Sequence, residues 1–186
     1  MENEIKLHVG CGEKYLQGFI HIDIRKFTHV NYITSADKLD MFNDNSVSLI
    51  YACHILDHFD RNTVEGILKE WYRVLKVDGI LRVAVSDFEK IVEVYLKNKN
   101  LEYLLGLLVG GQTYEGNKHG IAFDYTYLSK LLINAGFKNI HRYDWREVLP
   151  KGYDDFSRAY IPKINEVPKE DYEKGTLMSL NMECCK

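Results

Sequence analysis

The chain has 186 residues, of which 46% are hydrophobic, and a net charge of −3. This length and composition fit one domain with a substantial core. Lysine and arginine form no basic stripe, which disfavours a nucleic-acid partner, and no apolar run approaches the roughly 18 to 20 residues of a membrane span. The chain enters its first strand without a basic and apolar leader, and its four cysteines lack a CxxC pair, so we expect reduced thiols and a cytoplasmic location.

Five short apolar runs in the first half of the chain are typical of buried strands. These runs are residues 6–9, 19–22, 30–33, 47–52 and 80–85. A crossover helix is expected between the fourth and fifth runs, because its apolar residues recur on one face. Those residues are Val64, Ile67, Leu68, Trp71 and Leu75. Asp60 is the expected N-cap, and Asp78-Gly79 is expected to end the unit.

The second half of the chain carries longer helical patterns. A helical region is predicted over residues 88–109, with a break near residues 98–100, and a further helix is predicted over residues 125–134. A strand over residues 139–143 and a closing antiparallel strand over residues 176–184 complete the pattern. The series predicts an α/β fold of the Rossmann-like kind, with a mostly parallel sheet whose last strand is antiparallel.

The link between the first two strands is unusually short. Only residues 10–18 separate them, whereas a parallel crossover usually needs a dozen or more. Helices are therefore reduced in the N-terminal half, and one sheet face should be thinly covered. We expect a single domain with a core at 1–143, an extension at 144–175 that covers the sheet or the acceptor site, and the closing strand at 176–184. A second copy in a homodimer is the alternative cover.

Glycines and an acid follow the first two strands. Gly10-Cys11-Gly12 comes after the first apolar run, and Asp23 ends the second. Glycine lets the backbone pass close to a ligand, and a carboxylate at this strand tip can accept hydrogen bonds from two ribose hydroxyls. A nicotinamide fingerprint would need a helix opening on G-x-G-x-x-G. Residues 13–18 leave no helix N-terminus for a pyrophosphate, which favours an adenosine cofactor without one.

An ordered series of motifs supports a family resemblance. The motifs are LHVGCG, HIDI, SADKLD, SVSLIYACHILDH, EWYRVLKVDGILRVAV, LLINAGF and the tail LMSLNMECC. Together they resemble the class I S-adenosylmethionine-dependent methyltransferases, in particular a compact group with a short glycine loop, the methyltransferase type 11-like group. The resemblance covers about residues 6–143 and implies an enzyme with S-adenosylmethionine as its cofactor.

The resemblance implies a set of cofactor contacts. They are Gly10, Cys11 and Gly12 at the methionine part, Asp23 at the ribose, Ala36, Asp37 and Leu39 at the adenine, and Ala52 and Cys53 at the methionine amino group. The Asp23 carboxylate would hold the ribose hydroxyls, and the Asp37 carboxylate can accept from the exocyclic amine.

Three histidines are the candidates for catalysis. His54, Asp57 and His58 form H-x-x-D-H after the fourth strand, and His119 lies in the glycine-rich loop at 110–120, which could close as a lid. Histidine suits removal of the acceptor's proton at neutral pH. Some relatives carry acid-x-x-acid-His here and bind a divalent cation, but this chain has His54 at the first position. We assign no metal ligand; imidazoles with one carboxylate would suit zinc or another transition ion better than magnesium, and whether an ion binds stays open.

The molecule that accepts the methyl group is inferred only as a chemical class. Aromatic residues in the second half could stack on a sugar or a planar metabolite. They are Tyr114, Phe123, Tyr125, Tyr127, Trp145 and Tyr153. By analogy with relatives, the acceptor is an oxygen or nitrogen of a small molecule or of a glycan or polysaccharide precursor. The alternatives are a non-catalytic S-adenosylmethionine-binding sensor or regulatory subunit, and an aminopropyl transferase, for which no acidic polyamine pocket is evident.

Overall fold

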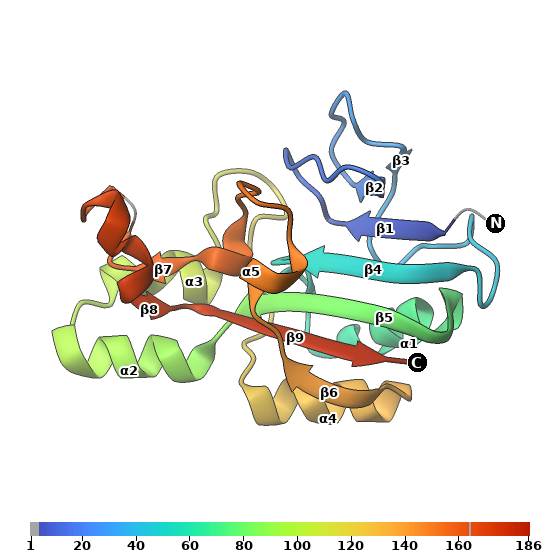
Figure 1. The fold of residues 1–186 in the computed structure, drawn as a ribbon. Helices are drawn as coiled ribbons and strands as arrows, with labels where there is room; N and C mark the ends of the chain where they lie inside the picture. Colours follow the sequence, from blue (N-terminus) through green and yellow to red (C-terminus); the bar gives the residue numbers. More distant parts are fainter. Residues whose placement is uncertain (1–3, 164) are drawn as a thin grey trace.

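The computed structural model describes residues 4–163 and 165–186 as an α/β fold built on a seven-stranded sheet (Figure 1). The strand order is β3-β2-β1-β4-β5-β9-β6, and only β9 runs antiparallel to its neighbours. The bounds are β1 Ile5–Val9, β2 Ile20–Asp23, β3 Tyr32–Ile33, β4 Val47–Cys53, β5 Leu75–Ser86, β6 Lys138–Arg142 and β9 Ser179–Cys185. This arrangement confirms the predicted Rossmann-like sheet with its antiparallel last strand.

Three predicted strands differ in extent from the observed ones. The closing strand, expected over residues 176–184, begins at Ser179, and Thr176–Leu177 pairs with Tyr160–Ile161 in a separate sheet. The third expected strand, over residues 30–33, is reduced to the two residues of β3. The fifth begins at Leu75 and not near Ile80, because Leu75 already pairs with Val47 and the pairing resumes at Ile80 with Leu49. Residues 76–79 bulge out between these two pairs, with Asp78 in the left-handed region (φ 61°). The Asp-Gly pair therefore bends a strand instead of ending the helix unit, and Leu75 belongs to the strand.

The helices lie mostly in the second half of the chain. Their bounds are α1 Val64–Val74, α2 Phe88–Asn98, α3 Leu105–Val109, α4 Tyr125–Ala135 and α5 Trp145–Val148. Short 3-10 turns occupy Leu56–His58, Glu102–Leu104, Phe156–Arg158 and Lys169–Lys174. Thr63, not Asp60, is the N-cap of α1, and the Asp60 carboxylate instead accepts the N–H of Asn62 in the preceding turn. Gly136 ends α4 in the left-handed conformation (φ 109°), as predicted.

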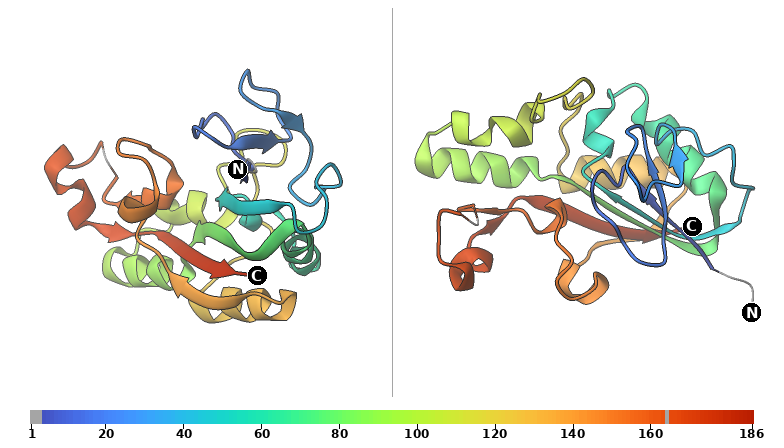
Figure 2. Two further views of the ribbon diagram at one scale, coloured as in Figure 1. Left: turned by 45° about the vertical axis from the view of Figure 1, so that its right-hand side comes forward. Right: turned by 90° about the horizontal axis from the view of Figure 1, so that it is seen from above.

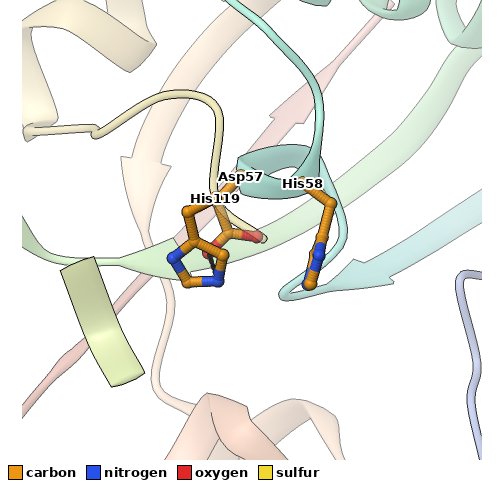
Figure 3. Close-up of side chains that lie close together, drawn as sticks. All are labelled: Asp57, His58 and His119. Atoms are coloured by element: carbon orange, nitrogen blue, oxygen red, sulfur yellow. Dashed lines mark ion pairs between the residues drawn. The ribbon is translucent and has the colours of Figure 1, made fainter. Parts of the chain in front are cut away.

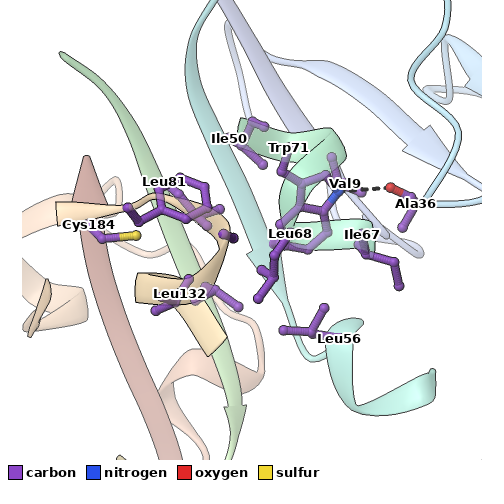
Figure 4. Close-up of a cluster of buried hydrophobic side chains, with 14 of the residues drawn as sticks. Val9, Ala36, Ile50, Leu56, Ile67, Leu68, Trp71, Leu81, Leu132 and Cys184 are labelled. Carbon is purple, nitrogen blue, oxygen red and sulfur yellow. Dashed lines mark hydrogen bonds between the residues drawn. The ribbon is translucent and has the colours of Figure 1, made fainter. Parts of the chain in front are cut away.

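One face of the sheet is covered by α1 and α4. Leu68 and Trp71 of α1 and Leu132 of α4 are fully buried there against β4 and β5 (Figure 4). The indole Nε1 of Trp71 donates to the carbonyl oxygen of Ala36 at 2.8 Å. This bond ties α1 to the segment after β3, so the helix also positions the adenine candidates.

On the opposite face, side chains from the described parts of residues 145–177 pack against the sheet (Figure 2). Trp145 and Tyr160 pack there with Tyr51 of β4, whose hydroxyl donates to the Asp155 carboxylate at 2.5 Å. Tyr160–Ile161 (β7) and Thr176–Leu177 (β8) pair as a small second sheet at the end of this segment. None of the helices in the described part of the chain combines the length and apolar character that a membrane crossing requires.

Candidate active site

The glycine loop after β1 is held against the carboxyl end of β2. The N–H of Gly10 donates to the carbonyl of Ile22 at 2.8 Å, and the N–H of Gly12 donates to Oδ2 of Asp23 at 2.7 Å. Both glycines have positive φ, 65° and 55°. A Cβ on Gly10 would lie 2.4 Å from the side chain of Ile55, so the close approach of the turn after β4 also requires glycine.

Asp23 is the buried acid at this edge, with 6% of its surface exposed. Its Oδ1 accepts the N–H of Arg25 at 2.8 Å, and its Oδ2 accepts that of Gly12. An ionised carboxylate offers about four lone-pair positions, and these two bonds use two of them. Nε of the Arg25 side chain also lies 3.5 Å from Oδ1. The acceptor capacity that remains on the carboxylate suits the ribose hydroxyls of S-adenosylmethionine.

The two thiols near this edge are protonated packing groups. Burial, together with the charge of Asp23, raises the pKa of Cys11 to about 12. Burial also raises the pKa of Cys53 well above its usual value, and its side chain belongs to the cluster on the face against which side chains from residues 145–177 pack. Nucleophilic chemistry needs the thiolate, so neither cysteine is suited to it.

The remaining cofactor candidates lie on both sides of the sheet edge. Ala36 is buried, with its carbonyl bound by Trp71, and Leu39 is fully buried beside it. Asp37 between them is exposed, so its carboxylate points into solvent. Ala52 is fully buried in the core under α1, so only its backbone could meet a ligand.

His54 is held by a chain of hydrogen bonds from β9. Asn181 donates its Nδ2 to the carbonyl of Ser157 at 2.8 Å, so its Oδ1 accepts the hydroxyl of Ser179 at 2.8 Å. Because the Ser179 hydroxyl uses its only hydrogen in the bond to Asn181, it can only accept from His54. Nε2 of His54, 3.0 Å away, therefore donates to the oxygen of Ser179. The other ring nitrogen of His54 lies 3.6 Å from Oδ2 of Asp57. Both ring nitrogens thus face protein groups, and the contact with Asp57 is an ion pair when the ring is protonated.

Asp57 and the other two histidines form a cluster at the end of β4 (Figure 3). Asp57 is 1% exposed, and its Oδ2 lies 3.6 Å from Nε2 of His119 and 3.4 Å from the hydroxyl of Ser86. The rings of His58 and His119 meet edge to face with centroids 5.0 Å apart. Each of the three cluster residues offers a ligand atom, and these atoms lie within 4.8 Å of one another.

Backbone carbonyls fix the tautomers of His58 and His119. The Nδ1 of His58 lies 2.9 Å from the carbonyl of Gly116, and the Nδ1 of His119 lies 3.0 Å from that of Leu107. A carbonyl oxygen only accepts, so each Nδ1 carries a proton, and each neutral ring keeps its lone pair on Nε2. Burial lowers the pKa of His119, against the opposing charge of Asp57. Burial alone would raise the pKa of Asp57, but the hydrogen bond and charge of His54, with the other two histidines, lower it to about 2.

The glycine-rich loop at 110–120 bridges the cluster and the loop after β2. Its Gly116 carbonyl binds His58, and its Tyr114 ring lies under the guanidinium of Arg25 at 4.4 Å from the ring centroid. The structure thus brings His54, His58 and His119 around Asp57. The sequence interpretation did not select Arg25, Ser179 or Asn181; their polar side chains beside strand ends are a weak signal that reveals no partner.

Comparisons with known proteins agree with this fold. Residues 20–83, about a third of the chain, match the model of a family described as "Methyltransferase domain". No match emerges among curated protein sequences.

Solved structures share the whole architecture. A S-adenosylmethionine-dependent methyltransferase from Archaeoglobus fulgidus aligns with 100% of this chain and 87% of its own, at 14% identity and a TM-score of 0.59. A Thermotoga maritima protein described as "possible histamine N-methyltransferase" aligns over 100% and 84%, at 18% identity and a TM-score of 0.57. The 1,6-didemethyltoxoflavin-N1-methyltransferase of Burkholderia thailandensis, with S-adenosylhomocysteine bound, aligns over 98% and 70%, at 14% identity and a TM-score of 0.54.

At these identities the structural likeness establishes the fold alone, and the family model matches only residues 20–83. The chain therefore has the fold of S-adenosylmethionine-dependent methyltransferases and contains a segment similar to their family model.

Proposed function

We propose that the protein transfers the methyl group of S-adenosylmethionine to an oxygen or nitrogen of a small molecule or glycan precursor bound beside Asp57, His58 and His119. The observation that carries the proposal is the bond from the Gly12 N–H to Asp23, which joins the glycine loop and the acid at one sheet edge. The loop at 110–120 connects this edge to the cluster through Arg25 and His58. The cofactor side of the site, at Asp23, and the acceptor side, at the Asp57 cluster, are therefore neighbours.

The proposal assigns a role to each residue on the cofactor side. Gly10, Cys11 and Gly12 line the methionine part, and Asp23 accepts from the ribose hydroxyls with its remaining acceptor capacity. The backbone of Ala36, the carboxylate of Asp37 and the side chain of Leu39 surround the adenine, while the backbone of Ala52 and Cys53 faces the amino group. The exposed Asp37 carboxylate is free to accept from the exocyclic amine.

The acceptor side handles a proton. S-adenosylmethionine supplies a methyl group on a sulfonium; as the bond to the acceptor forms, the C–S bond breaks, its electron pair stays on sulfur, and the acceptor loses its proton. Nε2 of His58 or of His119, each of which keeps a free lone pair, accepts that proton. His54, with both ring nitrogens facing protein groups, orients Asp57 and does not touch the acceptor.

The acceptor class is supported by the names of structural neighbours. The Thermotoga and Burkholderia proteins are named for N-methylation of small molecules, and a Nostoc punctiforme neighbour is described as a putative O-methyltransferase. In this chain the cluster suits either atom, because hydroxyls and amines both present a proton to a neutral imidazole.

Calorimetric binding of S-adenosylmethionine and S-adenosylhomocysteine tests the cofactor side. We expect saturable binding by both, and a loss of about a hundredfold in Asp23→Ala, since two ribose contacts disappear. Asp40→Ala, which removes an exposed acid with no assigned contact, serves as the matched control. Absence of binding by either compound, with Asp23→Ala no different from the control, would refute the proposal.

Turnover with a panel of hydroxyl and amine acceptors tests the acceptor side. His119→Ala should abolish methyl transfer while the affinity for S-adenosylhomocysteine stays within about threefold, because His119 lies outside the cofactor contacts. Tight cofactor binding without turnover on any acceptor would instead support the non-catalytic sensor.

A further inference from the structure

The Asp57 carboxylate has one oxygen without a partner although it is almost fully buried. The side chain is 1% exposed, and among the described residues no donor reaches Oδ1. Its other oxygen is surrounded by His54, His119 and Ser86. A buried charged oxygen without a bond is costly, so a cation or donor that is not part of the protein would complete it.

Two further lone pairs belong to the same cluster, in which His119 Nε2 lies 3.6 Å from Oδ2 of the Asp57 carboxylate. His58 and His119 each donate Nδ1–H to a backbone carbonyl, which leaves Nε2 free in the neutral ring. This is the arrangement in which metal-binding histidines are found, because the carbonyl fixes the tautomer and the ring orientation. Donation of both Nδ1 protons away from the cluster leaves the two Nε2 lone pairs and the Asp57 oxygen as a set of donors without a proton.

We propose that Asp57, His58 and His119 bind a divalent transition-metal ion. Their ligand atoms lie within 4.8 Å of one another, so small side-chain rotations bring them to the roughly 2.0–2.2 Å that zinc prefers for nitrogen and carboxylate oxygen. Two imidazoles and one carboxylate favour zinc, iron or cobalt over magnesium, which prefers oxygen ligands. Three protein ligands leave coordination positions open for another molecule.

His54 is a positioning residue in this site. Its Nε2 is committed to Ser179, and its Nδ1 faces the Oδ2 of Asp57, so it orients the carboxylate from the second layer. The donor set is therefore two histidines and one aspartate, with the C-terminal strand β9 supporting it through Ser179 and Asn181.

The catalytic meaning of the ion rests on the proposed function, whereas its binding does not. An acceptor hydroxyl placed in an open coordination position would have its pKa lowered, which eases loss of the proton during methyl transfer. With the ion bound, His58 and His119 would act through the metal, and the proton of the acceptor hydroxyl would pass to solvent water.

Metal titration of the tag-free protein after chelator treatment tests the site. With Co²⁺ we expect one ion per chain and visible ligand-field absorption, without the near-ultraviolet band of a cobalt–thiolate bond. Competition with a chromophoric chelator gives the Zn²⁺ affinity. His58→Ala and His119→Ala should each weaken it about a hundredfold or more, while His141→Ala, which removes an exposed histidine on β6, should leave it unchanged.

Several outcomes would overturn the proposal. They are no stoichiometric uptake of either ion, a cobalt–thiolate band, or equal affinity in wild type, His58→Ala and His119→Ala. His58 is only half-buried, so thermal unfolding should show that this variant folds and that a lost affinity is local. S-adenosylhomocysteine binding to the chelated protein separates the two proposals: retained binding without metal uptake refutes only the metal site, and metal uptake without cofactor binding refutes only the proposed function.

Discussion

One face of the sheet is packed by α1 and α4 with apolar side chains around Trp71, whereas the other is packed by residues 145–177 with aromatic and polar groups. On the first face stability comes from burial of apolar surface. The second also holds polar pairs, as in Tyr51–Asp155 and Asn181–Ser157, although the hydroxyls of Tyr143 and Tyr153 have no partner among the described residues. The second face leads directly to His54 through Ser179. The helical face thus holds the fold together, and the polar face orders the cluster that we propose for catalysis.

The largest expected effect is on the helical face. Trp71→Ala should lower the free energy of unfolding by about 3–5 kcal/mol, because it opens a cavity and leaves the Ala36 carbonyl without its donor. Urea unfolding measures this loss, with Val77→Ala at a 74% exposed position as the control. A cost below 1 kcal/mol would break the assignment of stability to this face.

A pH effect is expected from the polar face. His8 packs beside Tyr51 and is 2% exposed; burial, with the charges of His21 and His29, lowers its pKa to about 3. The unfolded chain therefore binds this proton more tightly, so stability is fully present above about pH 6.5 and is lost as the pH falls toward 3.

The expected loss from His8 is about 2 kcal/mol between pH 7.5 and pH 5. Urea unfolding at both pH values measures it, with His8→Leu as the comparison, since leucine has no proton to bind. Equal pH dependence in the two proteins would show that the polar face does not exclude charge from this position.

Ser179→Ala should have the smallest effect on stability and a clear effect on activity. Ser179→Ala removes the oxygen that accepts from His54 and the hydroxyl that donates to Asn181, and we expect a stability loss of about 1–2 kcal/mol. Because His54 then orients Asp57 less well, kcat should fall about tenfold while KM for S-adenosylmethionine stays unchanged. Ser129→Ala on α4, whose hydroxyl has no partner among the described residues, is the matched control. Equal kcat in both variants would show that the polar face does not influence the reaction through Ser179.

The sheet and the cofactor edge were accessible from the sequence for a physical reason. Buried parallel strands are short apolar runs, and their carboxyl ends meet at one edge, so Gly12 and Asp23 could be placed together. The start of β5 at Leu75 was missed, because Asp78-Gly79 is typical of a turn, and here it forms a bulge between two residues of one strand that both pair with β4. Local pattern carries no information on such tertiary pairing.

The histidine cluster was only partly accessible from the sequence. The spacing of His54, Asp57 and His58 showed that they are neighbours, but not that Asp57 is buried or that His54 turns toward Ser179. Which ring nitrogen is free depends on the carbonyls of Gly116 and Leu107, and nothing in the sequence identifies carbonyl partners.

The hydrogen bond between His54 and Ser179 joins residues 125 positions apart in the chain. Closing a loop of this length is slow, because the chain loses conformational entropy before the contact can stabilise the fold. The cluster therefore reaches its final geometry only when β9 has entered the sheet between β5 and β6, late in folding. Partly folded chains would hold the glycine loop and Asp23 in place before they could perform chemistry, so cofactor binding and catalytic competence should appear at different times during refolding.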